Sequence, residues 1–171
     1  MGAGILPISI YRDEIYILFG LERKNNLWCD FGGSSNKGEG VFKTAIREGY
    51  EELNGVLGTK YELEKIVNKN KIMKIEHNSY TSILFNTNFD NMLPIYFNNF
   101  NKFIEKNLSD RKVIDYKHNG LFEKNKIKWF TLSYFIDKEN KKQVRPHYIG
   151  ILDAIIDNKQ TILEHVKNSN K

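Results

Sequence analysis

Cysteine and proline are scarce in this chain of 171 residues, which argues against a disulfide framework and against a flexible linker. A single cysteine, Cys29, cannot form a disulfide within the chain, so we expect a buried thiol and a reducing, cytoplasmic location. Three prolines and no visible repeat favour one domain without a flexible linker. No run approaches the roughly 18 apolar residues of a membrane span, and residues 1–20 lack the basic start of a signal peptide. We therefore expect no membrane partner.

Arginine and alanine are also rare, while three other residue types dominate. The chain has 21 lysines, 20 asparagines and 20 isoleucines, but only 5 arginines and 3 alanines. The abundant types share A/T-rich codons, so the net charge of +5 has two explanations. It suits an anionic substrate or nucleic acid, and it equally fits codon bias. Composition leaves the oligomeric state uncertain.

The order of strand-like and helix-like segments predicts a single α/β domain over residues 1–171. Apolar, β-branched and aromatic runs predict strands, and apolar residues at helical spacing predict helices. We expect strands at 5–11, 15–19, 27–31, 78–89 and 126–132, a loop at 32–38, and helices at 41–53, 91–108 and 146–166. Residues 61–75 fit either a short helix or a strand.

The segment 32–54, GGSSNKGEGVFKTAIREGYEELN, carries the candidate chemistry. On a helical wheel Glu48, Glu51 and Glu52 share a face about 100° wide, and Gly49 falls on the opposite, apolar face, where it would let a strand approach. Crowded carboxylates repel one another, whereas a hard divalent cation such as Mg²⁺ would be bound by their oxygens. The alternative is a solvated acidic helix face.

The spacing of the charged residues resembles the Nudix box, the signature G-x5-E-x7-R-E-U-x-E-E-x-G-U of the Nudix hydrolase family, in which U is aliphatic. The matching positions are Gly33, Glu39, Arg47, Glu48, Glu51 and Glu52. Gly49, Asn54 and Gly55 depart from the pattern, and shifting it by one residue restores Gly55 as the late glycine. These departures concern the end of the helix and leave its acidic face intact.

The resemblance implies an α/β/α sandwich around a mixed β-sheet. It also implies hydrolysis of a nucleoside diphosphate linked to another moiety, with Mg²⁺ or Mn²⁺ as cofactor. By position, Glu48 and Glu52 would be the principal metal ligands, Glu51 a further ligand, and the backbone carbonyl of Gly32 another.

Other parts of the box would have structural or catalytic roles. The resemblance implies that Glu39 and Arg47 form a pair that holds the loop to the helix. Metal ions would neutralise the diphosphate and activate a water, and a carboxylate would act as general base. Glu48 is the candidate base within the box, and Glu123 is the candidate from a later loop. The alternative for Glu123 is an ordinary loop charge.

The substrate is less well defined by sequence. The aromatic candidates for stacking on a nucleobase are Trp28, Phe31, Tyr80, Phe85 and Trp129, although a core position is the stronger interpretation of each. Lysines at 102, 106, 112, 117, 124, 126 and 128 are candidates for an RNA-binding surface or, alternatively, a solvated face. Residues 91–119 are a candidate insertion beyond a minimal Nudix domain. The four histidines show no ligand spacing and receive no role.

Three functions stay open. The first is a pyrophosphohydrolase acting on a small nucleotide. The second is an mRNA-decapping enzyme of the same family acting on capped RNA, favoured by the positive charge. The third is a non-catalytic binding module with the same fold, against which the intact Glu48, Glu51 and Glu52 argue.

Overall fold

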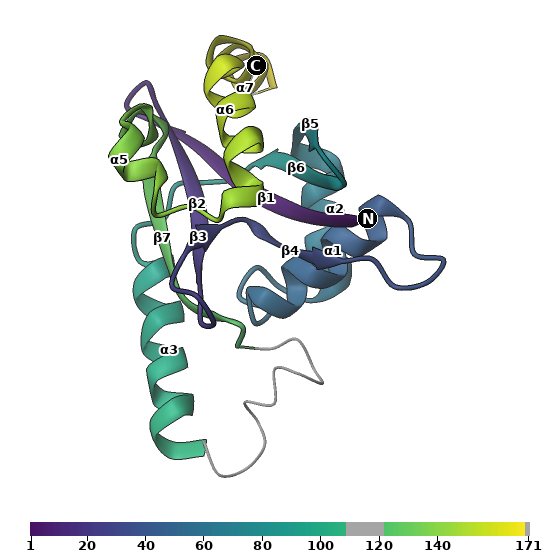
Figure 1. Ribbon diagram of the computed structural model, residues 1–171, viewed down its shortest axis with the longest axis vertical. Coiled ribbons are helices and arrows are strands. Elements are labelled where there is room, and N and C mark those ends of the chain that lie inside the picture. The colour runs from purple at the N-terminus through teal and green to yellow at the C-terminus, as the bar shows by residue number, and fades with distance from the viewer. Residues whose placement is uncertain (109–121, 170–171) are drawn as a thin grey trace.

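A mixed β-sheet lies between two layers of helices, as Figure 1 shows. The computed structural model describes residues 1–108 and 122–169. The strands are β1 (Gly2–Tyr11), β2 (Glu14–Glu22), β3 (Trp28–Cys29), β4 (Phe31–Ser34), β5 (Lys71–His77), β6 (Tyr80–Asn86) and β7 (Lys124–Thr131). The helices are α1 (Val41–Glu52), α2 (Lys60–Asn70), α3 (Leu93–Leu108), α5 (Lys138–Lys141), α6 (Ile149–Asp157) and α7 (Lys159–Ser169), with 3-10 turns η2 (Leu132–Ile136) and η3 (Pro146–Tyr148). The predicted α/β/α sandwich is confirmed.

Strand β1 organises the sheet. It pairs parallel with β6 and antiparallel with both β2 and β4, so the sheet is mixed. Strand β2 in turn pairs antiparallel with β3 and β7, and β5 pairs with β6. Arg12 and Asp13 close the β1–β2 hairpin with φ angles of 52° and 59°. Through these strand pairings, the start of β1 lies beside two segments: strand β4, which leads into α1, and the turn between β5 and β6.

Alternation of side chains along the strands builds two hydrophobic cores. In β1, Ile5 faces the core under α1 and α2, whereas Leu6 and Ile8 face the core under α6 and α7. In β2, Ile17 and Leu18 divide between the two cores in the same way. Both faces of the sheet are therefore covered.

Three sequence predictions need correction or limits. Residues 32–34 continue strand β4, so the predicted loop begins later. The ambiguous segment 61–75 contains both α2 and β5, because a capping box at Thr59 starts a helix that ends before Lys71. The helix predicted at 91–108 is present as α3, but residues 109–119 of the candidate insertion, with Lys112 and Lys117, lie outside the described residues.

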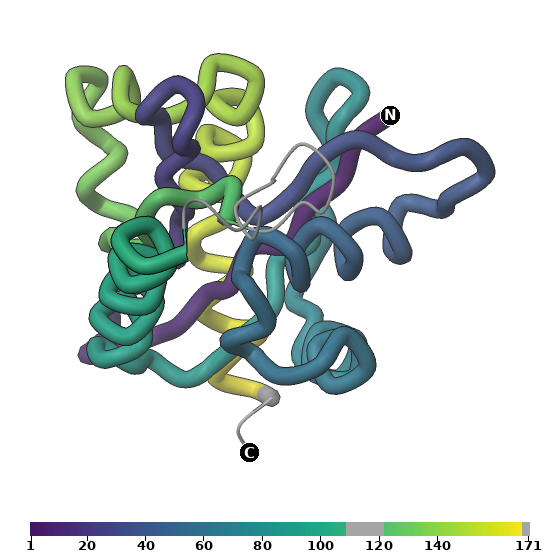
Figure 2. Tube along the Cα trace, turned by 90° about the horizontal axis from the view of Figure 1, so that it is seen from below, coloured from purple at the N-terminus to yellow at the C-terminus, as the bar shows by residue number. Residues whose placement is uncertain are grey.

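A close contact of α1 positions the segment 32–54 against the sheet. The loop after β4 projects from the molecule before the chain turns back into α1, as Figure 2 shows. Helix α1 lies close to β1 at Gly49, where a Cβ would lie 2.4 Å from Cδ1 of Ile5. A glycine at this departure from the box pattern therefore lets β1 and α1 touch, as its position on the apolar face predicted.

Among the described helices, none is both long and apolar enough to cross a membrane.

Candidate active site

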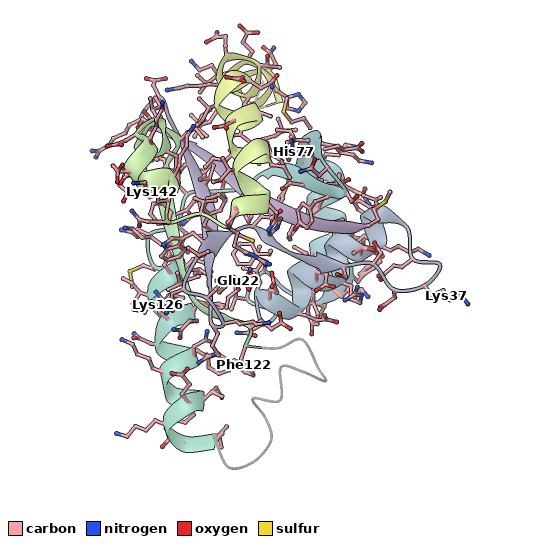
Figure 3. The ribbon with its side chains drawn as sticks, viewed as in Figure 1. Glu22, Lys37, His77, Phe122, Lys126 and Lys142 are labelled. Atoms are coloured by element: carbon pink, nitrogen blue, oxygen red, sulfur yellow. The ribbon has the colours of Figure 1, made fainter. Side chains whose placement is uncertain are left out.

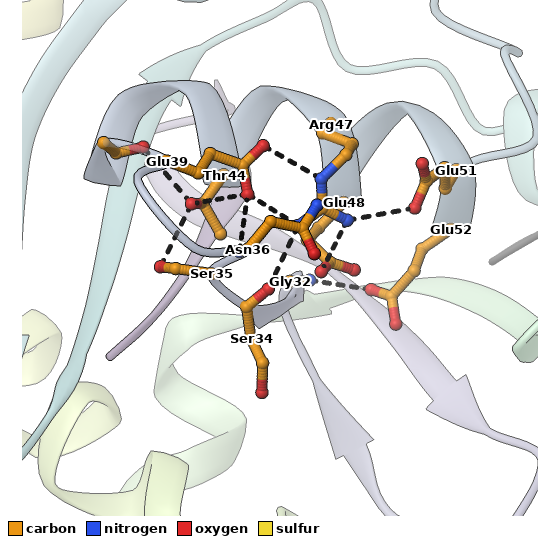
Figure 4. A network of polar contacts seen from close by, with 11 residues as sticks. Gly32, Ser34, Ser35, Asn36, Glu39, Thr44, Arg47, Glu48, Glu51 and Glu52 are labelled. Carbon is orange, nitrogen blue, oxygen red and sulfur yellow. Dashed lines mark hydrogen bonds and ion pairs between the residues drawn. The ribbon is translucent and has the colours of Figure 1, made fainter.

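Arg47 is the centre of the polar contacts made by the box segment (Figure 4). Its Nε and Nη2 donate to the two carboxylate oxygens of Glu39 at 3.0 and 2.8 Å. Nη1 donates to Glu48 at 2.8 Å and to Glu51 at 3.3 Å, and Nη2 also donates to the carbonyl of Ser34 at 3.0 Å. These donors hold the pKa of Glu39 at about 2. One guanidinium therefore ties the end of β4, the loop and two of the three helix carboxylates together.

Glu39 also organises the loop itself. Its Oε2 accepts the backbone N–H of Asn36 at 3.0 Å and contacts the hydroxyl of Thr44 at 3.1 Å. Thr44 lies in the first turn of α1 and is buried, and its hydroxyl is 3.1 Å from that of Ser35. The loop is consequently fastened to the start of the helix at several points.

Glu48 packs directly against the strand. A Cβ built on Gly33 would lie 2.6 Å from the carboxylate carbon of Glu48, so a side chain at position 33 would displace that carboxylate. Burial raises the pKa of Glu48, and the charge of Glu51 adds to this, although Arg47 acts in the opposite direction. The leading glycine of the box therefore provides the space that the first glutamate occupies.

Glu52 lies deeper, in the interior between α1 and the sheet. Its side chain is only 2% exposed, its Oε2 accepts the N–H of Gly32 at 2.7 Å, and its Oε1 is 3.2 Å from Nζ of Lys124. Burial raises its pKa well above the ordinary value, and the Lys124 charge only partly opposes this. The predicted acidic face is thus divided: Glu48 and Glu51 contact Arg47, and Glu52 contacts Lys124.

Sequence reasoning missed the buried cluster around Lys124. This ammonium is fully buried and pairs with Glu22 at the end of β2 as well as with Glu52, and Arg145 reaches Glu22 at 3.2 Å. Burial alone would lower the pKa of Lys124, but the negative charges of Glu22 and Glu52 outweigh it and raise the pKa. Figure 3 shows Glu22 in the middle of the molecule. No sequence signal marks Lys124, because it is one of 21 lysines.

The predicted later-loop residue, Glu123, lies near this cluster. Burial raises its pKa most, and the charges of Glu22, Glu48 and Glu51 contribute to the increase. Its carbonyl accepts the N–H of Arg23 at 3.0 Å. The structure therefore brings Glu123 close enough to the box carboxylates to interact with them electrostatically.

Asn54, where the box pattern has glycine, connects the end of α1 to this segment. Its φ is 51°, a left-handed conformation that asparagine tolerates, and Gly55 follows with φ 69°. The Asn54 side chain accepts the N–H of Phe122 at 2.9 Å and donates to Asn101 of α3 at 3.0 Å. Asn101 in turn donates to the carbonyl of Lys124 at 2.8 Å. This departure from the pattern therefore fixes the backbone on both sides of Glu123.

The donor set matches a hard divalent cation in kind. Glu22, Glu48, Glu51, Glu52 and Glu123 supply carboxylate oxygens, which Mg²⁺ and Mn²⁺ prefer. Burial, together with neighbouring carboxylates, raises the pKa values of Glu48, Glu52 and Glu123. Within residues 1–108 and 122–169, however, no three acidic, histidine or cysteine side chains are arranged to hold an ion. Arg47 and Lys124 contact the three helix carboxylates instead. An incoming cation would compete with these two side chains.

The aromatic candidates for substrate stacking lie in or against the core. Phe31 is fully buried under α1, and Trp129 is 9% exposed with its Nε1 donating to the carbonyl of Asp90 at 2.8 Å. Trp28 is half-buried against Phe130, with ring centroids 5.0 Å apart. These placements support the alternative, core interpretation of the three residues. Cys29 is buried as predicted, and burial raises its pKa well above the ordinary value.

Asp30 provides a pH-dependent contribution to stability. Asp30 is fully buried, and burial raises its pKa from 3.8 to about 6. The hydroxyls of Ser82 and Tyr80, which donate to its carboxylate at 2.7 and 2.8 Å, and the nearby charge of Lys124 only partly oppose this increase. The pKa of Asp30 is higher in the folded state than in the unfolded state. Its contribution to the free energy of unfolding is therefore fully present below about pH 4 and is lost as the pH rises through about 6. The loss amounts to roughly 3 kcal/mol at neutral pH.

Asp30→Asn should therefore gain stability relative to wild type as the pH rises from 4 to 7. Urea unfolding across this range measures the difference in free energy of unfolding. The matched control, Asp157→Asn, removes an exposed carboxylate of α6, and its difference should stay constant. A flat difference for Asp30→Asn would show that the buried carboxylate is not protonated near pH 6.

The fold of the chain is shared with known protein structures. A strand, a loop and a helix, joined by an Arg–Glu pair, place acidic side chains at one end of an α/β/α sandwich. No protein-family model and no curated protein sequence matches the chain. Solved structures do match, and they identify the fold as that of the Nudix hydrolases.

Three of these structures illustrate the similarity. A C. elegans Ap4A hydrolase is 15% identical, with a TM-score of 0.53 over 94% of this chain and 98% of that one. RenU, a Nudix hydrolase from M. smegmatis, is 10% identical, with a TM-score of 0.52 over 94% and 86%. A bifunctional NMN adenylyltransferase/ADP ribose pyrophosphatase from Francisella tularensis, complexed with AMP and Mn ion, is 16% identical, with a TM-score of 0.52 over 91% of this chain and 41% of that one.

Proposed function

We propose that the protein is a metal-dependent Nudix pyrophosphohydrolase that cleaves the diphosphate bond of a nucleoside diphosphate linked to another moiety. The observation that carries this proposal is the convergence of Glu48, Glu51 and Glu52 of α1 with Glu123, which is distant in sequence. Crowded carboxylates are costly for a fold, and raised pKa values such as those of Glu48, Glu52 and Glu123 are typical of catalytic sites. The structural similarity to an Ap4A hydrolase and an ADP ribose pyrophosphatase supports the same class of reaction.

In this proposal Glu48, Glu51 and Glu52, with the carbonyl of Gly32, would hold Mg²⁺ or Mn²⁺. The ion would neutralise the diphosphate and lower the pKa of a bound water. Arg47 keeps the helix and the strand in register through Glu39, so it is a positioning residue. Each carboxylate would move from its present partner, Arg47 or Lys124, toward the ion.

Glu123 is the better candidate for the general base. Glu48 is bonded to Arg47, which stabilises its charged form and weakens it as a base. In the described part of the chain, no hydrogen bond is donated to the Glu123 carboxylate. Burial raises its pKa as it raises that of Glu48, so the carboxylate without a donor is the feature that favours Glu123. Glu123 would therefore take the proton from the attacking water.

Capped RNA is the second candidate substrate. Lys102 and Lys106 on α3 and Lys126 and Lys128 on β7 are exposed, and the two elements pack together. Four of the predicted lysines are therefore exposed on neighbouring elements. Lys124, which belonged to the same prediction, is instead fully buried and cannot contact RNA.

The test is a substrate panel with the ion supplied or removed. Purified protein is incubated with ATP, diadenosine tetraphosphate, ADP-ribose or capped RNA, in MgCl₂ or MnCl₂ and in EDTA, and the products are separated chromatographically. We expect cleavage of at least one substrate with the ion, none in EDTA, and recovery when the ion is restored. Equal turnover in EDTA would contradict the metal requirement. No turnover of any substrate would favour the non-catalytic binding module.

A further inference from the structure

A cleft of about 380 Å³ lies on the side of β4 facing away from Glu48. The start of β1, the end of β4, the β5–β6 turn and the segment before η3 line it. That last segment is fixed to β3, because Trp28 accepts the N–H of Arg145 at 2.9 Å and donates to Gln143 at 2.8 Å. The volume is within the range of small-molecule sites, which begins at about 300 Å³. The cleft therefore has room for a small ligand next to the box glycines.

The aromatic ring of Tyr80 lines the bottom of this cleft and packs against the sheet. A Cβ on Gly2 would lie 2.9 Å from its ring, and a Cβ on Gly4 or Gly32 would lie 2.3 or 2.1 Å from its hydroxyl. Three positions without side chains thus leave the space in which the tyrosine lies against the sheet. Its hydroxyl donates to the buried Asp30 at 2.8 Å, which fixes the orientation of the ring. A fixed aromatic ring is a suitable platform for a planar group.

Two histidines and one arginine form the walls of the cleft. His147 stands across Tyr80, with ring centroids 5.5 Å apart and an interplanar angle of 69°. His77 (Figure 3) contacts α6 at Gly150, where a Cβ would lie 2.5 Å from its ring. The Arg145 side chain is 33% exposed and uses Nη1 for Glu22, and a guanidinium carries five N–H donors in all. None of the described residues that line the cleft carries a carboxylate.

We propose that this cleft binds a nucleoside 5′-phosphate group, with the base against Tyr80 and His147 and the phosphate on Arg145. A planar aromatic ring favours stacking by a planar ligand, and an arginine with N–H donors not used by Glu22 favours binding of an anion. The inference rests on the proposed function in one respect, because it assigns one end of the substrate to this cleft. Gly33 borders the cleft and also faces Glu48, so the proposed nucleotide site and the box carboxylates share strand β4.

The test measures binding without turnover. Titration calorimetry in EDTA compares AMP with ribose 5-phosphate, which keeps the phosphate and lacks the base. His147→Ala, at an exposed residue, should weaken AMP binding by about three- to tenfold and leave ribose 5-phosphate unchanged. Arg145→Met should weaken both ligands by about tenfold to a hundredfold, because it removes a charge-assisted hydrogen bond. The matched control is Lys142→Met, which removes one positive charge from an exposed ion pair outside the cleft.

The outcomes separate this inference from the proposed hydrolase. If AMP does not bind, or binds wild type and both cleft variants equally, the inference is wrong even where the protein cleaves a diphosphate. If AMP binds as expected and no substrate is cleaved, the inference holds and the hydrolase proposal fails. Should Arg145→Met not fold, His147→Ala alone decides, because the loss must be specific to the ligand that carries a base.

Discussion

Lys124→Met is expected to lower the free energy of unfolding by about 3–5 kcal/mol, the cost of leaving buried charges without a partner. The Lys124 ammonium is fully buried and lies between Glu22 of β2 and Glu52 of α1. Methionine retains an unbranched side chain, and its methylenes would fit along Gly20, which the Lys124 side chain crosses: a Cβ there would lie 2.7 Å from Cδ of Lys124. The variant therefore removes mainly the charge.

Urea unfolding followed by circular dichroism measures this loss. Lys126→Met is the matched control, since it is an exposed lysine on the same strand and should change stability by less than about 0.5 kcal/mol. Adding Glu52→Gln to Lys124→Met should restore part of the stability, because Glu52, which loses its cationic partner, is then neutral, while Glu22 keeps Arg145. An unchanged unfolding midpoint for Lys124→Met would show that the two carboxylates are not held by this lysine.

The helix and its acidic face could be predicted from local periodicity. A helix was expected at 41–53 and is found at Val41–Glu52, and Gly49 lies against Ile5 as its place on the apolar face indicated. A wheel, however, gives only directions. It placed Glu48, Glu51 and Glu52 together as equals, whereas their neighbours in the fold divide them between Arg47 and Lys124.

The partners of Glu52 could not be predicted, because they come from distant parts of the chain. Glu22 and Lys124 are 102 positions apart and meet only because β2 pairs with β7. Tyr80 could be named from the sequence as a stacking candidate, but the cleft around it could not be predicted. Histidines 77 and 147 have no informative spacing, and the glycines that accommodate the Tyr80 ring lie on β1 and β4. The other aromatic candidates, Trp28, Phe31, Phe85 and Trp129, lie in or against the hydrophobic core.

Glu52→Gln is expected to reduce cleavage of the best substrate by at least about a hundredfold while the protein stays folded. Altering residues that merely support metal ligands typically costs about 10–100-fold, so a direct ligand should cost no less. The glutamine carbonyl can still accept the N–H of Gly32, and Lys124 retains Glu22. Burial already raises the pKa of Glu52, so a neutral side chain of the same shape is well suited to this interior position.

The two measurements for Glu52→Gln should therefore diverge, with activity lost and the free energy of unfolding preserved or increased. That divergence distinguishes a functional carboxylate from a structural one, whose replacement would lower stability and activity together. Glu64→Gln on α2 is the matched control, because it neutralises an exposed glutamate outside the box and should leave both quantities unchanged. Full turnover in Glu52→Gln would exclude Glu52 as a metal ligand and leave Lys124 and Glu22 as a purely structural cluster around it.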